Sequence, residues 1–368
     1  MKAAIRAGYT ATETEIARRG GRFAVVTHQA AGTAERLHAA FPDRLAAIFS
    51  PEHGYFGAAG AGEKTADCVH PAWGVPVHSL YGETRKPRME TLEGLSFAVF
   101  ALQDIGVRCF TYLGTLAYFL EAAAEAGLPV IVEDRPVPLG GTVDGLRLDP
   151  GLESFVAPVD VPFCHGMTPG EAAAWIARKR NLDIDLTICL PPGVSAAETR
   201  PWPGFLPPSP AIRSWDCAVA YPATVFCEAF PAIGCGRSGP LAFRILSAPW
   251  LDARALAEKA NPALSRTGFA LAPYAPPPEN GEAPREAALL VLKSASPLPA
   301  EAGFIMLDAI LRTERGPAAE GARPEWLDKL CGRKGILDML LAGELGRLLE
   351  ECAAARAQWA GERIFFRK

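Results

Sequence analysis

The sequence predicts a two-domain α/β protein, with a parallel sheet covered by helices followed by a smaller α+β domain. Three observations predict this class. The chain has 368 residues, more than one ordinary hydrophobic core accommodates. Short apolar runs alternate with helical patterns through the first half, which is typical of parallel strands joined by helices. The pattern changes after a proline-rich passage at 191–210. We therefore expect domains over residues 1–212 and 213–368.

The first half contains the strands and helices of the expected parallel sheet. Each expected strand is a short run rich in Val, Ile or Phe and bounded by turn residues or charges. Thr168-Pro169-Gly170-Glu171 begins one helix with an N-cap threonine, a proline at the first helical position and a glutamate at the third. We expect strands over residues 23–27, 45–49, 97–102, 129–132 and 186–189, and helices over 33–40, 115–126 and 168–180.

The second half predicts a smaller mixed domain. A glycine-rich turn occupies Gly234 to Gly239, and a second proline-rich loop covers residues 273–284. Trp202 and Phe205 favour an ordered, cleft-lining loop over a plain linker in the first proline-rich passage. We expect strands over 218–221 and 287–292, and helices over 301–312, 324–330 and 336–356.

Composition excludes several classes of partner. Apolar residues make up 49% and charged residues 21% of the chain, as in a globular protein with ample core material. The net charge is -4 without a basic stripe, so we expect no nucleic-acid partner. No apolar run is long enough to cross a bilayer, and we expect no membrane partner. The N-terminus shows no apolar signal region, so the expected location is cytoplasmic. The oligomeric state is left open.

The nine cysteines are scattered and form no C-x-x-C pair. This spacing fits neither a zinc finger nor a disulfide framework, so we expect free thiols, mostly buried. Cys109, Cys164 and Cys235 are the alternatives for a catalytic cysteine because they lie beside the motifs described below. All six histidines precede residue 166, so histidine chemistry belongs to the first half.

Polar residues follow four of the expected strands. In an open parallel sheet, ligands bind beyond the carboxyl ends of the strands. We therefore expect one shared polar site, centred on the segment Ser50-Pro51-Glu52-His53-Gly54. The strand ends deliver His28 and Gln29, then Glu52 and His53, then Gln103 and Asp104, and finally Glu133, Asp134 and Arg135.

The motifs of several other enzyme classes are absent. The sequence has no G-x-G-x-x-G after its first strand, no G-x-S-x-G and no H-E-x-x-H. We expect no cofactor and no metal, although a metal-dependent hydrolase using His53 and Asp104 stays an alternative. Carboxylates with arginines and aromatic residues suit glycoside hydrolysis, which needs a general acid and a second group at the anomeric carbon. Glu52 and Asp104 are the predicted catalytic pair.

Three turns add candidate substrate-binding residues. Tyr81 and Arg85 lie in a turn that combines an aromatic ring with cations, which suits an anionic substrate. His165 precedes a helix N-terminus, a favourable place for an anion. Arg237 lies in the glycine-rich turn, and Glu228 is interpreted either as its buried partner or as a substrate contact.

A set of motifs in this order resembles one known family. The chain is similar, from about His28 to Trp250, to the NamZ-type exo-β-N-acetylmuramidases, a family of glycoside hydrolases. The motifs are Ser50-Pro51-Glu52-His53-Gly54, Ser79-Leu80-Tyr81-Gly82, Gln103-Asp104-Ile105-Gly106-Val107-Arg108, Thr111-Tyr112, Asp134-Arg135-Pro136, His165-Gly166-Met167-Thr168 and Pro207-Pro208-Ser209-Pro210.

The resemblance implies a fold, a reaction and roles for residues. It implies a Rossmann-like domain followed by a smaller C-terminal domain, with the active site in the cleft between them. It implies release of N-acetylmuramic acid from the non-reducing end of peptidoglycan fragments, with Glu52 as the catalytic acid. The lactyl carboxylate of that sugar needs cations, which implies roles for Arg108, Arg135 and Arg237. Tyr112 completes the expected substrate-binding set.

The chain also departs from the family pattern. Val137, Ala211 and Ala101 stand where the family has polar residues, and His28 replaces an asparagine. These departures leave open a related amino sugar as substrate, and also a non-catalytic paralogue that binds muramyl sugars. The acetamido group of the sugar could assist at the anomeric carbon, and the sequence does not choose between this assistance and a second carboxylate such as Asp104.

Overall fold

The computed structural model describes residues 3–8, 10–190, 204–237, 239–276 and 286–362. They form two compact units. The first comprises the described residues of Met1–Gly140 and Met167–Pro210, and the second those of Gly141–Gly166 and Ala211–Glu362. The domain boundary expected at residue 212 stays a prediction, and in this division the segment Gly141–Gly166 groups with the later residues.

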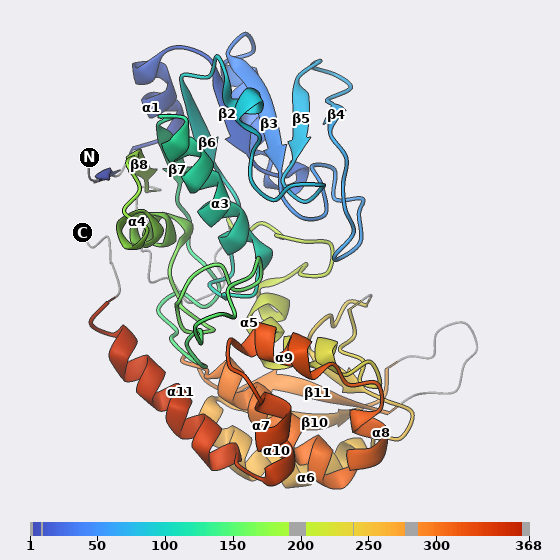
Figure 1. The fold of residues 1–368 in the computed structure, drawn as a ribbon. Coiled ribbons are helices and arrows are strands. Elements are labelled where there is room, and N and C mark those ends of the chain that lie inside the picture. The colour runs from blue at the N-terminus through green and yellow to red at the C-terminus, as the bar shows by residue number, and fades with distance from the viewer. Residues whose placement is uncertain (1–2, 9, 191–203, 238, 277–285, 363–368) are drawn as a thin grey trace. The chain divides into compact units, whose positions relative to one another are not determined.

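The first unit is built on a large, mostly parallel sheet (Figure 1), which confirms the predicted fold class. All neighbouring strands pair in parallel except β4, which runs antiparallel to β5. In spatial order the strands are β1 (Ala4–Gly8), β8 (Asp185–Cys189), β7 (Val130–Glu133), β6 (Phe97–Phe100), β2 (Phe23–Val26), β3 (Leu45–Ser50), β5 (Pro76–Ser79) and β4 (Cys68–Val69).

The order of the strands reverses at the centre of the sheet. From β2 the chain continues to β3 on one side, while β6 pairs with β2 on the other side. Every residue of β2 and β6 is buried, as expected for continuous apolar runs in a parallel sheet. In open α/β sheets the ligand crevice lies outside the carboxyl ends of such a pair of strands. This topology predicts a ligand crevice beyond Val26 and Phe100.

Four helices of the described residues accompany this sheet. They are α1 (Thr12–Arg19), α2 (Thr33–Ala40), α3 (Thr111–Glu125) and α4 (Pro169–Lys179), with short 3₁₀ segments at Gln29–Ala31 and Met89–Leu92. The capping box predicted for α4 is confirmed, because the Thr168 side chain accepts a hydrogen bond from Glu171 N and the Glu171 side chain accepts one from Thr168 N. α3 and α4 pack against each other, and α4 packs against β7 and β8.

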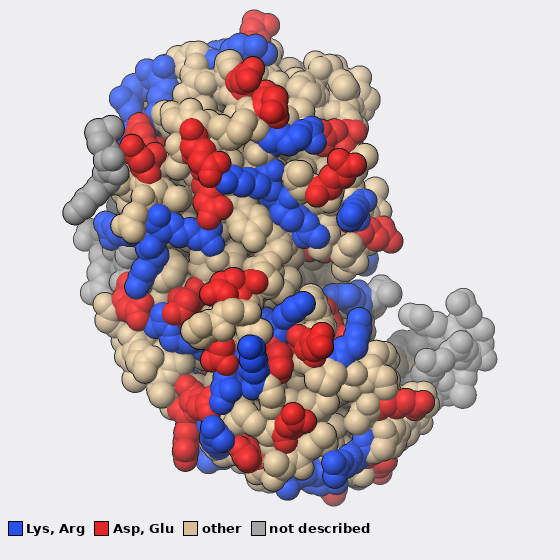
Figure 2. Space-filling view, viewed as in Figure 1, with Lys and Arg blue, Asp and Glu red and all other residues tan. Residues whose placement is uncertain are grey.

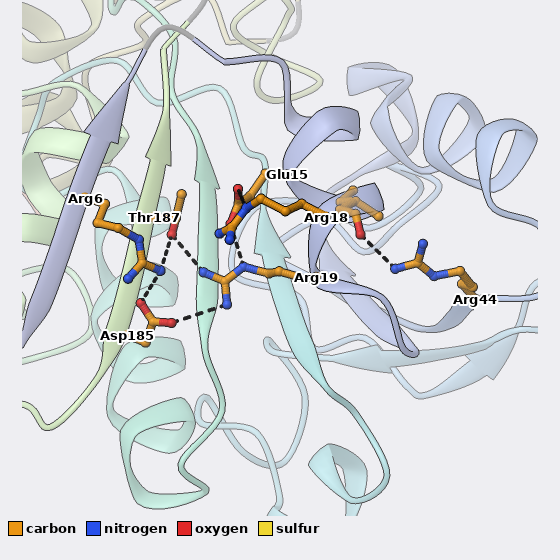
Figure 3. Close-up of polar contacts among 8 residues, drawn as sticks. Arg6, Glu15, Arg18, Arg19, Arg44, Asp185 and Thr187 are labelled. Carbon is orange, nitrogen blue, oxygen red and sulfur yellow. Dashed lines mark hydrogen bonds and ion pairs between the residues drawn. The ribbon is translucent and has the colours of Figure 1, made fainter.

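The sequence analysis did not identify β1 and α1. A polar network holds them to β8 (Figure 3). Arg6 donates to Asp185 at 2.6 Å and to Thr187 at 3.1 Å, and Arg19 reaches the same two side chains at 3.3 and 2.8 Å. Glu15 accepts from Arg18 and Arg19. The edge strand is thus fixed by its ladder with β8 and by these ion pairs, neither of which is visible as hydrophobic periodicity.

The second unit is an antiparallel sheet with helices. The sheet has the order β10 (Phe269–Tyr274), β11 (Ala287–Leu292) and β9 (Ile245–Ser247). α6 packs on β10, and α7 contacts α5, α6, α10 and α11. The helices are α5 (Trp215–Thr224), α6 (Ala253–Leu264), α7 (Pro299–Thr313), α8 (Arg315–Ala319), α9 (Pro324–Cys331), α10 (Ile336–Ala342) and α11 (Leu345–Trp359), with 3₁₀ segments at Val225–Ala229 and Ser265–Thr267.

Two secondary-structure predictions are wrong, and two predicted loops lie partly outside the described residues. Residues 218–221, expected as a strand, lie inside α5, whose N-cap Ser214 accepts a hydrogen bond from Cys217 N. The single helix expected over 336–356 is two helices, separated at Gly343, which has φ +81°. The loop expected over 273–284 begins within β10, and its residues 277–284 lie outside the described residues. Trp202 and most of the first proline-rich passage also lie outside them.

The surface and the cysteines agree with the composition. Figure 2 shows acidic and basic side chains interspersed on the face in view. Within the described ranges, no helix is long and apolar enough to cross a membrane. All nine cysteines are free, and only Cys68 is exposed. Burial raises the pKa of the Cys235 thiol to about 11, which disfavours the reactive thiolate.

Candidate active site

The loop after β3 carries Glu52 and has a tightly fixed backbone. His53 and Gly54 both have a positive φ, +73° and +72°, which turns the chain sharply. Gln29 N donates to Tyr55 O at 2.7 Å, so the loop is attached to the segment that follows β2. The Tyr55 hydroxyl donates to Glu35 Oε1 on α2 at 3.0 Å. Both bonds hold the loop at Tyr55, directly after the turn that follows Glu52.

Hydrogen-bond donors surround the Glu52 carboxylate. Gly62 N donates to Oε1 at 2.6 Å, and the Thr111 hydroxyl at the start of α3 donates to Oε2 at 2.8 Å. The Tyr81 phenol is also hydrogen-bonded to Glu52. Since the donors come from three different segments, the carboxylate is held in one orientation. Such preorganisation is what a proton-transferring group requires.

Tyr81 is buried beneath Arg85. The Arg85 guanidinium lies over the Tyr81 ring, 3.5 Å from its centroid, and is hydrogen-bonded to the same side chain. Burial is the main cause that raises the pKa of Tyr81, and the charge of Glu52 acts in the same direction. The phenol therefore remains protonated at neutral pH and acts as a donor.

Asp104 lies beyond β6, at the crevice predicted by the strand order. Its Oδ1 accepts hydrogen bonds from Ile105 N at 2.6 Å and Gly106 N at 2.7 Å. Among the described residues, none donates a hydrogen bond to Oδ2. Burial raises the pKa of Asp104 to about 6 despite the two amide bonds. A carboxyl group with a pKa raised in this way suits proton transfer in acid–base catalysis.

The charges of Glu52 and Asp104 both affect the Tyr112 phenol. Its pKa is raised by burial and, in addition, by the charges of both Glu52 and Asp104. Both carboxylates thus act electrostatically on the Tyr112 phenol, which itself donates to Pro208 O. That Glu52 and Asp104 form one catalytic site stays a prediction.

His28 is the third member of this group around Tyr112. Its ring centroid lies 5.9 Å from that of Tyr112, and its side chain is almost fully buried. Burial lowers the pKa of His28 to about 4, with smaller contributions from the charges of Arg135 and His53. His28 is therefore neutral at pH 7, and its Nε2 has no hydrogen-bond partner among the described residues.

The polar residues after β7 are bonded to the surrounding protein. Asp134 accepts from Gly170 N at 2.7 Å and from the Thr168 hydroxyl at 2.9 Å, both at the start of α4. Burial raises its pKa to about 7. Arg135 pairs with Glu133 rather than with Asp134. The substrate-binding roles expected for Asp134 and Arg135 stay predictions, and the contacts present are structural.

Two more predicted residues lie in the loop after β6. Gln103 is fully buried and donates through Nε2 to Asp104 O and to Pro136 O, both at 2.9 Å. It therefore fixes the backbone of Asp104 to the segment after β7. Arg108 is also fully buried.

A metal site is not formed by the described residues. No group of three or more His, Cys, Asp or Glu side chains among them is arranged to hold an ion. His53 Nδ1 is hydrogen-bonded to Ala59 O at 2.9 Å, and Asp104 Oδ1 to backbone amides.

The remaining predicted residues belong to the second unit. Arg237 forms an ion pair with Glu228, as the structural interpretation of Glu228 expected, and also lies over the Phe243 ring. His165 is buried within the segment Gly141–Gly166. Substrate contacts of these three residues stay predictions.

Two residues at Glu52 were missing from the predicted site. Thr111 belongs to a motif of the resemblance, but a hydroxyl at a helix start gave no signal of a contact with a side chain 59 positions earlier. Gly62 contributes only its backbone N–H, which no side-chain pattern reveals.

Several known proteins are similar to this chain. A family model described as the N-terminal part of exo-beta-N-acetylmuramidase NamZ matches residues 22–216, and one for the C-terminal part matches residues 219–366. Peptidoglycan beta-N-acetylmuramidase NamZ of Bacillus subtilis (strain 168) is 37% identical over 232 residues, 60% of this chain and 54% of the relative. The match therefore spans about half the length of that relative.

Two solved structures are also similar. Both are DUF1343 family proteins of Bacteroides fragilis NCTC 9343. One has a TM-score of 0.80 at 25% identity, covering 95% of this chain and 94% of that chain. The other has a TM-score of 0.70 at 23% identity, covering 96% and 97%, and shows the fold alone.

Proposed function

The chain belongs to the NamZ family of exo-β-N-acetylmuramidases, and from this premise we propose that it is a glycoside hydrolase that releases N-acetylmuramic acid, or a related amino sugar, from the non-reducing end of peptidoglycan fragments. The observation that supports the proposal most strongly is the pair of carboxyl groups, Glu52 after β3 and Asp104 after β6, whose charges both act on Tyr112. Glycosidases of most families use two carboxyl groups in this way.

Glu52 is the proton donor in this proposal. The transferred proton is assigned to Oε2 in this proposal, because Oε1 faces Gly62 N–H, which can only donate. The Thr111 hydroxyl bonded to Oε2 can rotate, so this oxygen accommodates both protonation states. Glu52 passes the proton to the glycosidic oxygen as the bond from that oxygen to the anomeric carbon breaks.

In this proposal Asp104 acts on the nucleophile, which is either a water molecule or the 2-acetamido group of the sugar. Its open Oδ2 accepts a proton from the attacking water, or holds the N–H of the 2-acetamido group while that group attacks the anomeric carbon. The anomer formed first, read by proton NMR, distinguishes direct water attack, which inverts the centre, from acetamido assistance, which retains it.

The experiment that tests the proposal measures N-acetylmuramic acid released from a muramyl disaccharide. We expect Glu52→Gln to reduce kcat by about 100- to 10,000-fold, the range of general acid–base catalysis. Glu63→Gln is the matched control, since Glu63 is exposed in the same loop and bonds only to Gly60 N among the described residues. Equal turnover by Glu52→Gln and the control would contradict the proposal.

Binding without turnover is the alternative outcome. A wild-type chain that is thermally stabilised by the disaccharide but releases no sugar would be a muramyl-sugar-binding paralogue. A cytoplasmic site of action, on fragments taken up by the cell, also stays a prediction, which fractionation of cells producing the tagged chain would test.

A further inference from the structure

We infer that Tyr81 and Arg85 are positioning residues for the proton transfer by Glu52, with Arg85 acting through the Tyr81 ring, rather than residues that grip an anionic substrate. This inference rests on the proposed function, because it assigns a role within the same reaction. It concerns a turn whose aromatic and cationic residues suit substrate binding by sequence alone, but whose side chains contact each other and Glu52 in the structure.

The backbone of Tyr81 is fixed on both sides. Tyr81 N donates to Ser79 Oγ at 3.1 Å, and Tyr81 O accepts from Thr65 N at 3.1 Å. The hydroxyls of Thr65 and Ser79 are hydrogen-bonded to each other at 2.6 Å. A Cβ at Gly82 would lie 2.7 Å from Thr65 O, so only glycine permits this close approach. The phenol is therefore delivered to Glu52 from a rigid support.

Arg85 lies over the Tyr81 ring. A guanidinium 3.5 Å from the ring centroid is well within cation–π distance, and the ring is buried. The positive charge draws electron density from the ring and makes the phenol O–H a stronger donor. Arg85 thereby strengthens the hydrogen bond from Tyr81 to Glu52 through the ring.

The consequence for the reaction is specific. As Glu52 gives its proton to the glycosidic oxygen, a negative charge develops on its carboxylate. The Tyr81 phenol is in place to stabilise that charge, together with Gly62 N and the Thr111 hydroxyl. The contribution is realised only when protonation of the leaving group is needed.

Leaving-group dependence tests this role. A sugar leaving group requires protonation, whereas 2,4-dinitrophenolate departs without it. For the muramyl disaccharide we expect Tyr81→Phe to lower kcat by roughly 10- to 100-fold, part of the contribution of the general acid, with KM nearly unchanged. For the dinitrophenyl β-muramide we expect a change of less than about 3-fold. Arg85→Gln should show the same pattern with a smaller loss.

The controls separate this role from a structural one. Lys86→Gln removes a neighbouring cation, which pairs with Glu125 at 2.6 Å, and should leave both substrates unaffected. Thermal midpoints establish that each variant is folded, and Arg85→Lys provides a second, more conservative variant. Arg85→Lys should recover part of the loss, since lysine also makes cation–π contacts.

Two outcomes would overturn the inference. Equal losses on both substrates would show that Tyr81 and Arg85 act independently of protonation. A raised KM with unchanged kcat would show that they bind the substrate. Glu52→Gln, measured in the same assays, keeps the two proposals apart: if it shows the leaving-group dependence and Tyr81→Phe does not, the proposed function stands and this inference fails.

Discussion

Two buried carboxyl groups follow neighbouring strands of the sheet but have different surroundings. Asp104 follows β6 and Asp134 follows β7, and burial raises the pKa of both, to about 6 and about 7. Asp134 uses both oxygens to accept hydrogen bonds from the first turn of α4. Asp104 accepts two bonds on one oxygen from its own loop, and the described residues leave the other oxygen unbonded.

The difference comes from the helix that approaches each strand end. At Asp134, α4 begins within hydrogen-bond reach, and a Cβ at Gly170 would lie 2.8 Å from the Asp134 carboxyl carbon. Glycine therefore permits the helix to close over this carboxylate. At Asp104, Gly106 with φ +82° turns the chain before α3 begins at Thr111. A carboxyl group at a strand end can thus either anchor the next helix, as Asp134 does, or keep one oxygen unbonded by the described residues, as Asp104 does.

The largest expected effect is on turnover, which should depend on Asp104 and not on Asp134. We expect Asp104→Asn to lower turnover of the muramyl disaccharide at least about 100-fold, because Oδ2 can no longer accept a proton. Asp134→Asn should retain turnover within roughly 3-fold, since the amide still accepts from Gly170 N and can donate to Thr168. Steady-state kinetics on both variants measures this contrast, and similar losses in both would remove the distinction.

The next largest effect is on the free energy of unfolding, which should depend more on Asp134 than on Asp104. Asp134→Ala leaves Gly170 N and the Thr168 hydroxyl without their acceptor in a buried place, so we expect a loss of about 2 kcal/mol in the free energy of unfolding. Asp104→Ala should cost less, because its partners are two adjacent amides in a loop. Urea unfolding of both variants gives the comparison. A more destabilised Asp104→Ala would reverse the assigned roles.

The pH dependence of stability tests the state of Asp134. Its folded pKa of about 7 lies above the ordinary value of 3.8, so the folded state binds more protons between these values. The stabilising contribution is complete below about pH 4 and is lost as the pH rises through 7. Asp134→Asn should therefore flatten the fall in urea midpoint between pH 4.5 and about pH 7.5, relative to wild type. An unchanged slope would contradict the raised pKa.

The smallest effect on stability is expected for Arg36, an exposed partner of Glu133 at the end of β7. Arg36 pairs with Glu13 and Glu133 and is 40% exposed, so solvent screens its charge. We expect Arg36→Gln to cost less than about 1 kcal/mol and to leave turnover unchanged. Thermal unfolding at low and high salt checks this, because the difference from wild type should shrink at high salt. A loss comparable to that of Asp134→Ala would place Arg36 in the support of the site.

Local patterns predicted much of the first unit. Continuous apolar runs identified β2, β3, β6, β7 and β8, and a capping box identified the start of α4, because both signals depend on neighbouring residues only. β1 was not predicted because its sequence Ala4-Ile5-Arg6-Ala7-Gly8 is short and polar at the edge of the sheet. α5 was misassigned as a strand because a short apolar run has no periodicity that separates the two.

The sequence predicted which polar residues follow the strands, but not the contacts that each of them makes. By itself the sequence determined the strands and the polar residues at their carboxyl ends, since these follow from composition and spacing along the chain. Only the tertiary structure decided that Asp134 anchors α4, that Arg85 lies over Tyr81, and that Thr111 and Gly62 hold Glu52. Each of these contacts joins segments distant in sequence, and their geometry arises from packing that no local pattern encodes.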